Sequence, residues 1–183
     1  SIALPAGSTT RLGGGSELRA AANFDVAIDG NVFFDNYSGR SQIFGRTFTF
    51  GAPGAMTIDN HELVINCPSA SLGGFVNLRT ASSILTATGS LSSAGVLNST
   101  SGRISTGSGL SLSGVPNLLN STISAGGPVT INATNAVLTQ VTLMAPSLAI
   151  TGGKTTIGGT ISAPITNSGT ILTANTTTIY GNI

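Results

Sequence analysis

The chain has 183 residues, of which 40% are hydrophobic and only 7% are charged. Charged residues make up about 25% of a usual globular domain, yet Ile, Leu and Val are spread along the whole chain and supply enough apolar surface for a core, which excludes a disordered polypeptide. The formal net charge of +1 excludes a general electrostatic attraction to nucleic acid or anionic membranes. We therefore expect no nucleic-acid partner. We also expect no membrane span, because the sequence has no uninterrupted apolar run of about 18 residues.

The charged residues are distributed unevenly. All six acidic residues and four of the basic residues lie within positions 1–62, which gives this part a net charge of −2. Only Arg79, Arg103 and Lys154 carry charge beyond it, a net +3. Two interpretations stay open: a solvated first third beside a neutral remainder, or a rod whose two ends carry opposite charge.

Residues 1–63 are rich in aromatic side chains and less regular than the remainder. Asp29-Gly30, between the apolar runs VAI and NVFF, predicts a tight hairpin turn. The alternation TFTF at 47–50 predicts a strand. We expect irregular N-terminal coils or a cap with an aromatic-rich hairpin region, in which the aromatic rings either fill a broader core or form a contact surface. The aromatic residues of this part are Phe24, Phe33, Phe34, Tyr37, Phe44, Phe48 and Phe50.

Residues 64–183 contain degenerate repeats with a period of about 18 to 20 residues, and a fixed period of this kind indicates a stacked repeat architecture. The repeats begin at Val64, Ile84, Ile104, Ile123, Leu143 and Ile161. Each holds three apolar clusters separated by turn formers, and alternations such as LSLS and VTIN have the period of a strand rather than that of a helix. Three short strands per repeat predict one coil of a three-sided β-helix. The sequence therefore predicts an all-β fold, a single-chain β-solenoid whose regular repeats cover 64–183; at about 4.8 Å per coil, the whole chain would form a rod roughly 40–45 Å long.

Signals for catalysis are sparse. No carboxylate side chain follows Glu62, so the regular coils lack the acid–base pair that glycoside hydrolysis needs. His61 is the single histidine; a Ser–His or Cys–His system would have to use it, but beside Glu62 at a turn we expect it at the surface. Cys67 is the single cysteine and lies in an apolar run, which predicts a buried, inert thiol. We expect no catalytic residue and no enzyme.

Metal and cofactor sites are equally poorly supported. One histidine and one cysteine are too few for a zinc site, and we expect no cofactor. Calcium at Asp29, Asn31 and Asp35 is an alternative, although the repeat of calcium-bound β-rolls is absent. The stretches KTTIGGT and TANTTTI raise an ice-binding alternative, which the variable repeat spacing disfavours. We therefore expect no metal ligands.

The repeat unit ISAGGPVTINATNAVLTQVT and its neighbours, rich in Gly, Asn, Ser and Thr, resemble the repeats of filamentous-haemagglutinin-like adhesins. The resemblance covers about residues 64–183 and lies in composition and period. It implies a right-handed β-helix exported to the cell surface for adhesion or matrix building. The chain departs from that family in its short length and in lacking the family's secretion-domain signature at the N-terminus.

The two ends of such a coil suggest a function. Each end is a ring of unpaired strand edges, which recruit other strands unless covered. A start at Ser1 without Met fits a processed, secreted protein. Our first hypothesis is a structural subunit of an extracellular self-assembling filament or surface fibre, stacked head-to-tail as a homopolymer. The second is a non-polymerising adhesin or fibre-tip module that binds glycans, matrix or a host receptor. The residues expected at the subunit interface are Ile2, Leu4, Phe33, Phe34, Tyr37, Ile179, Tyr180 and Ile183.

Overall fold

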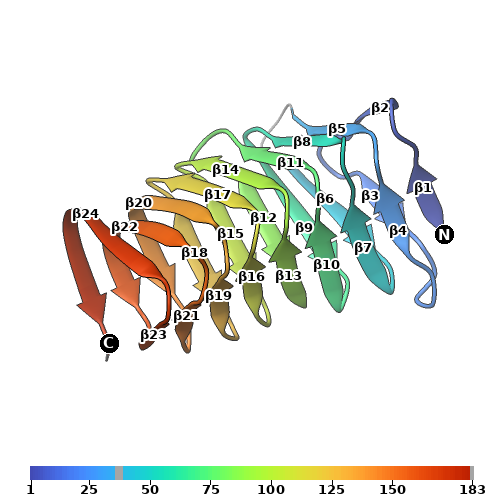
Figure 1. Ribbon diagram of the computed structural model, residues 1–183. Coiled ribbons are helices and arrows are strands. Elements are labelled where there is room, and N and C mark those ends of the chain that lie inside the picture. Colours follow the sequence, from blue (N-terminus) through green and yellow to red (C-terminus); the bar gives the residue numbers. More distant parts are fainter. Residues whose placement is uncertain (36–38, 182–183) are drawn as a thin grey trace.

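The structure is a computed structural model that describes residues 1–35 and 39–181, apart from the side chain of Asn175. Its strands wind into a rod of stacked coils (Figure 1). The sequence-based prediction of an all-β, single-chain β-solenoid is confirmed. Helices are absent from the described residues, so these contain no helix of the length and apolar character that crosses a membrane.

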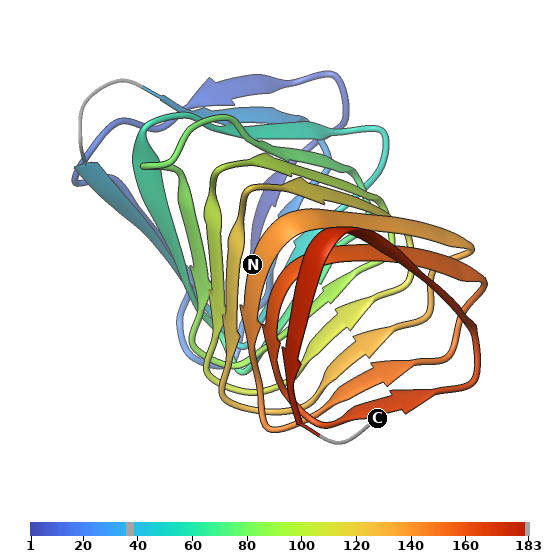
Figure 2. The ribbon, with the colours of Figure 1, turned by 90° about the vertical axis from the view of Figure 1, so that its left-hand side faces the viewer.

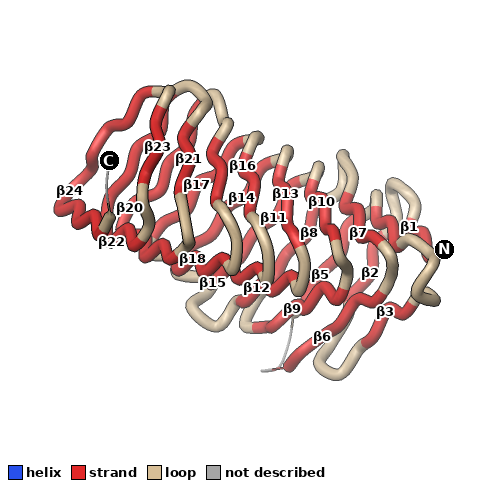
Figure 3. The backbone as a smooth tube through the Cα atoms, turned by 90° about the horizontal axis from the view of Figure 1, so that it is seen from below, coloured by secondary structure: helices blue, strands red, loops and turns tan. Residues whose placement is uncertain are grey.

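Three faces of parallel strands form the sides of the rod (Figures 1 and 3). Face A consists of β1 (Ile2–Leu4), β4 (Val26–Ile28), β7 (Thr47–Phe50), β10 (Ser69–Leu72), β13 (Ser90–Ser93), β16 (Leu110–Leu112), β19 (Val129–Ile131), β21 (Leu148–Ile150) and β23 (Ile165–Asn167). Face B begins with β2 (Thr9–Arg11), β5 (Asn31–Phe34), β8 (Ala55–Ile58), β11 (Phe75–Leu78), β14 (Val96–Thr100) and β17 (Val115–Leu119). Face C begins with β3 (Glu17–Arg19), β6 (Gly39–Phe44), β9 (His61–Asn66), β12 (Ile84–Ala87), β15 (Arg103–Thr106) and β18 (Thr122–Ala125). The long strands β20 (Asn135–Met144), β22 (Lys154–Ser162) and β24 (Thr170–Tyr180) complete faces B and C by running through the corner between them.

Alternate side chains of each strand point into the rod and stack in columns from coil to coil. On face C, one buried column runs through Leu63, Leu85, Ile104, Ile123, Leu143 and Ile161. The repeat starts predicted from Ile104 onward are confirmed, but those at Val64 and Ile84 are each one residue out of register. At Ile84 the neighbouring Leu85 is the fully buried residue. Val64 is itself buried, but Leu63 is the residue in register with Leu85.

The coils shorten along the chain, so the rod tapers toward its C-terminal end (Figure 2). On face A, Val26 lies in register with Ile2 one coil earlier, and Ile165 lies in register with Leu148. The coil from Leu148 to Ile165 is seven residues shorter than the coil from Ile2 to Val26. The predicted repeat spacing holds for the middle coils, where Leu91 and Leu110 are in register.

The predicted hairpin at Asp29-Gly30 is wrong. Strand β4 before it pairs in parallel with β1 and β7 on face A, and β5 after it pairs in parallel with β2 and β8 on face B. The two residues form a corner between faces. Val26 and Ile28 before the corner and Val32 and Phe34 after it are all buried, so both strands must line one core, which a protruding hairpin would not allow.

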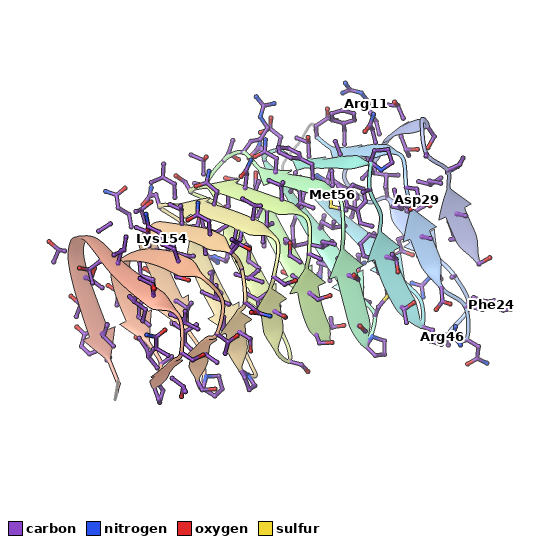
Figure 4. The ribbon with its side chains drawn as sticks, in the orientation of Figure 1. Arg11, Phe24, Asp29, Arg46, Met56 and Lys154 are labelled. Atoms are coloured by element: carbon purple, nitrogen blue, oxygen red, sulfur yellow. The ribbon has the colours of Figure 1, made fainter. Side chains whose placement is uncertain are left out.

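The aromatic side chains of the N-terminal coils have divided roles. Phe34, Phe48 and Phe50 are fully buried and fill the wider coils. Phe33 and Phe44 lie on the outer surface beneath the guanidinium groups of Arg11 and Arg19, whose carbons lie 5.1 and 3.8 Å from the ring centroids. Phe24 is 53% exposed and projects from the wide end of the rod (Figure 4).

The corner between faces B and C is closed in several coils by one residue in the left-handed backbone region. Asn60, Ser101, Asn120 and Gln140 have φ angles of 50°, 66°, 50° and 54°. Asn tolerates this conformation better than other non-glycine residues. The Asn120 side chain also donates from Nδ2 to Ser101 Oγ at 3.0 Å, linking the corners of successive coils.

This corner gives a test of the fold. Asn120→Val places a β-branched residue at a positive φ and removes the hydrogen bond to Ser101, so we expect it to lower the free energy of unfolding by about 2 kcal/mol. Asn120→Gly tolerates the backbone and should change it by less than about 1 kcal/mol. Urea unfolding followed by circular dichroism measures both. Asn117→Val, on the exposed side of β17, controls for the added side chain, and equal stability of the two Asn120 variants would contradict the assigned corner.

Candidate assembly interface

The N-terminal edge of the rod leaves part of the core uncovered. Strands β1, β2 and β3 each have a strand neighbour on one side only. Ile2 and Leu4 in β1, Leu18 in β3 and Leu12 directly after β2 pack against the core but stay partly exposed. Residues of the same columns one coil later, such as Val26 under Ile2, are fully buried. The edge therefore presents an apolar surface that one more coil would bury.

The C-terminal edge is hollow. A cavity of about 300 Å³ opens where β23 and β24 end the stack, at the end that faces the viewer in Figure 2. Asn167 at its rim exchanges two hydrogen bonds of 3.0 Å with the backbone of Gly169, so its side chain is already satisfied. The cavity is lined by Ile157, Ile165, Asn167, Ile171, Thr173, Thr177 and Ile179.

The backbone groups of the N-terminal edge alternate in direction. The Ile2 N–H donates to Asp25 O at 3.2 Å and the Leu4 carbonyl accepts from Asp29 N at 2.8 Å, so both residues turn their peptide groups toward β4. Because successive residues of a parallel strand bond to opposite neighbours, the N–H and C=O of Ala3 point to the open side. Two backbone groups of β1 thus await a partner strand.

The C-terminal edge has the matching alternation. Pro164 O accepts from Leu148 N, and Ser168 N donates to Ile150 O, both at 2.8 Å. Ile165 and Asn167 therefore direct their peptide groups to the open side. A second copy whose β1 continued face A beyond β23 would place its Ile2 over Ile165, so that inward side chains and hydrogen-bond directions match in the same register.

The corner lengths allow faces A and B to continue together. In the last coil, the inward residue Ile165 of face A and the inward residue Ile171 of face B are six positions apart. In the first coil the corresponding residues, Ile2 and Thr10, are eight positions apart. Neighbouring coils within the rod already differ by this amount, with six residues from Val26 to Val32 and eight from Phe48 to Met56. The corner from face C to face A is different, because it shortens from seven residues at Leu63–Ala70 to four at Ile161–Ile165.

The structure separates the eight residues predicted for the interface. Ile2, Leu4 and Ile179 lie at the open edges with inward side chains; Tyr180 is 65% exposed on the outer side of the last strand. Phe34 was a wrong assignment: it is fully buried, and its ring stacks on His61 at a centroid distance of 6.0 Å. Phe33 lies on β5, which has neighbours on both sides, and Arg11 covers its ring. Tyr37 and Ile183 lie outside the described residues.

Sequence reasoning missed four aliphatic residues of the edges, namely Leu12, Leu18, Ile165 and Ile171. The signal that could have found them is the register between coils, because each stands at an inward position in, or directly after, a first or last strand. The irregular N-terminal spacing hid this register for Leu12 and Leu18.

Ion pairs neutralise most charges within the rod. Four pairs join neighbouring coils and one lies within β3, so among the described residues only Asp29, Arg103 and Lys154 have no ion-pair partner. The opposite net charges of the two parts of the sequence therefore leave little field at the edges. The pairs are Arg11–Asp35, Arg19–Glu17, Arg40–Glu62, Arg46–Asp25 and Arg79–Asp59.

The pair between Asp25 and Arg46 holds the first coil to the second. Arg46 donates from Nε and Nη2 to the two carboxylate oxygens at 3.0 and 2.6 Å, and Thr47 Oγ1 donates to Asp25 at 2.7 Å. These donors, with the Arg46 bonds contributing most, lower the pKa of Asp25 to about 2. Arg46 projects from the wide end of the rod in Figure 4.

The lowered pKa of Asp25 predicts a pH dependence of stability. A carboxylate with a depressed pKa in the folded state stabilises the protein above its unfolded pKa of about 3.9, and this contribution is lost as the pH falls toward about 2. We expect Asp25→Asn to lower the melting temperature at neutral pH, and the difference from the unchanged protein to shrink between pH 4 and pH 2. Asp29→Asn is the matched control. A pH-independent difference for Asp25→Asn would contradict the ion pair.

The prediction of a surface position for His61 is wrong, because its side chain is 1% exposed. Ser41, equally buried, donates from Oγ to Gly13 O at 2.9 Å and lies 2.9 Å from His61 Nε2. Since the serine has one proton and gives it to Gly13, His61 Nε2 is the donor in the second bond. This direction is the reverse of the one a serine nucleophile needs, so the pair acts as a polar link through three coils.

The remaining candidate residues do not gather into a site. Asp29 and Asp35 lie beyond opposite ends of β5; Asn31 Oδ1 accepts from Ala55 N at 3.0 Å, and Arg11 pairs with Asp35. The described residues contain no group of three or more His, Cys, Asp or Glu side chains placed to hold a metal ion. The prediction of a buried thiol is confirmed, since Cys67 is 1% exposed and burial raises its pKa.

Comparison of the chain with family models, with curated proteins and with solved structures finds no significant match.

Proposed function

We propose that this protein is a structural subunit of an extracellular self-assembling filament, in which the C-terminal edge of one copy stacks on the N-terminal edge of the next. The observation that supports the proposal is the agreement of strand direction, hydrogen-bond direction and inward side chains when Ile2 of one copy lies over Ile165 of another. Repetition of such a head-to-tail contact does not close on itself and generates a fibre.

Whether two copies associate depends on the backbone hydrogen bonds formed between their edges, because apolar burial at the junction only roughly balances the cost of association. About six partly exposed aliphatic side chains would be covered at each junction, and covering half of each contributes on the order of 5–9 kcal/mol. Association costs of about 4–15 kcal/mol oppose this gain. Apolar burial alone is therefore marginal, and the unmade backbone hydrogen bonds of the two edges would tip the balance toward assembly.

Electron microscopy of the purified protein tests the proposal directly. We expect long, unbranched filaments with an axial repeat of about 43 Å, the length of roughly nine coils at 4.8 Å each. Light scattering should show a size that grows with concentration. A discrete monomer at all concentrations would overturn the proposed function.

A variant of the N-terminal edge tests the assigned register. Ala3→Pro combined with Thr9→Pro removes two N–H groups that point to the open side, because Ser8 and Leu12 rather than Thr9 bond to the neighbouring coil. Proline is tolerated at such edge positions. We expect at least a tenfold loss of polymer in sedimentation assays with an unchanged circular dichroism spectrum.

The matched control for this variant is Ala3→Ser with Thr9→Ser, which keeps both N–H groups and should polymerise normally. Polymerisation of the proline variant at the rate of the control would show that β1 and β2 do not form the junction.

The taper favours a second candidate, a non-polymerising adhesin or fibre-tip module. The corner from face C to face A is shorter by three residues at the narrow end than at Leu63–Ala70, so a stacked copy would overhang there. Under this second candidate the purified protein stays monomeric and binds a surface ligand through its sides.

A further inference from the structure

Face B carries two parallel columns of outward side chains on β11, β14 and β17, along the upper surface in Figure 1. Phe75, Val96 and Val115 are in register on successive coils and form an apolar column. Phe75 is 40% exposed and Val115 is 53% exposed. Two residues further along the same strands, Asn77, Asn98 and Asn117 are also in register and form an amide column. We call the six residues together the amide–apolar surface.

The amides of this surface are available to a ligand. Asn77 and Asn98 are partly exposed and Asn117 is exposed. None of the three side chains makes a hydrogen bond to another residue within the part of the chain that the structure describes. Each amide offers two donor hydrogens and one acceptor oxygen. The column thus repeats a donor–acceptor set at the coil spacing of about 4.8 Å.

The surface carries no charge. Its six residues are neutral, and Arg79, which follows β11, lies 3.3 Å from Asp59 and is neutralised by it. An anionic ligand would therefore find no free cation within these two columns. The two columns together favour a ligand that is uncharged, polar along one side and apolar on its faces.

We propose that the amide–apolar surface binds an extended, uncharged polysaccharide that runs along the rod axis. A sugar ring combines apolar C–H faces, which can lie on Phe75 and the valines, with hydroxyl groups that both donate to and accept from amides. One ring is about as long as the 4.8 Å coil spacing, so successive rings meet equivalent positions on successive coils. This inference goes beyond the filament role and does not depend on whether copies stack.

A second copy of the chain fits this surface less well. A stable protein interface buries roughly 800 Å² on each partner, with an apolar centre. Three apolar side chains spread over three coils offer much less, and an unpaired amide column would be buried beside them at a cost. A polysaccharide needs only a narrow, polar-edged strip.

Isothermal titration calorimetry with uncharged β-1,4-linked glucose and N-acetylglucosamine hexasaccharides tests the proposal. It is performed on the unchanged protein and on the Ala3→Pro, Thr9→Pro variant, so that a failure of polymerisation does not affect the result. We expect saturable binding of at least one hexasaccharide to both proteins. Phe75→Ala and Asn98→Ala should each weaken it at least fivefold.

Two controls locate the binding. Phe24→Ala removes an exposed phenylalanine from the corner between β3 and β4, away from face B. Thr122→Ala changes the outer side of face C. Both variants should bind the hexasaccharide as the unchanged protein does. The proposal is overturned by absence of saturable binding, by binding of heparin alone, or by binding that survives both Phe75→Ala and Asn98→Ala. A change of particle size in light scattering on Phe75→Ala, with unaltered glycan binding, would instead assign the surface to a second copy.

Discussion

The fold depends on inward aliphatic side chains that stay in register from one coil to the next. A shift of one residue would turn every inward side chain of a strand to solvent, and a parallel ladder fixes that register through its backbone hydrogen bonds. Corners can therefore vary in length while columns cannot. This constraint explains why the long coil from Ile2 to Val26 and the short coil from Leu148 to Ile165 coexist in one rod.

The width of each coil is matched by the volume of what fills it. The wide N-terminal coils hold Phe34, Phe48 and Phe50, while the middle and narrow coils hold mainly Leu, Ile, Val and Ala. Close packing leaves little room for voids, so shortening a corner requires smaller or fewer inward side chains. Phenylalanine is concentrated in the N-terminal part of the sequence because the wide coils there need large inward side chains to fill them.

The sequence predicted the architecture because period-two alternation and repeat length are properties of neighbouring residues. It could not separate a corner from a hairpin at Asp29-Gly30, since both need a sharp change of direction and differ only in which strands pair afterwards. It placed His61 at the surface because Ser41, which accepts its hydrogen bond, belongs to the preceding coil. At Phe33-Phe34 and Ile84-Leu85 the sequence left open which residue of the pair is buried, because the answer depends on how the strand pairs with the neighbouring coils.

Complementary edges are a general property of parallel coils, because inward residues always turn their peptide groups toward the next coil. Complementary edges alone therefore do not distinguish a filament subunit from a protein that stays monomeric. The distinction depends on whether the faces and corners of two copies can continue across the junction. Here faces A and B can continue across it, whereas the shortened corner between faces C and A makes a step in cross-section. A polymer of this chain would carry such a step once per subunit, while face B would run on continuously. Face B is one of the two faces that continue, and it bears the amide–apolar surface on β11, β14 and β17. Stacking would therefore repeat this surface once per subunit along one side of the polymer and raise the effective concentration of binding sites there.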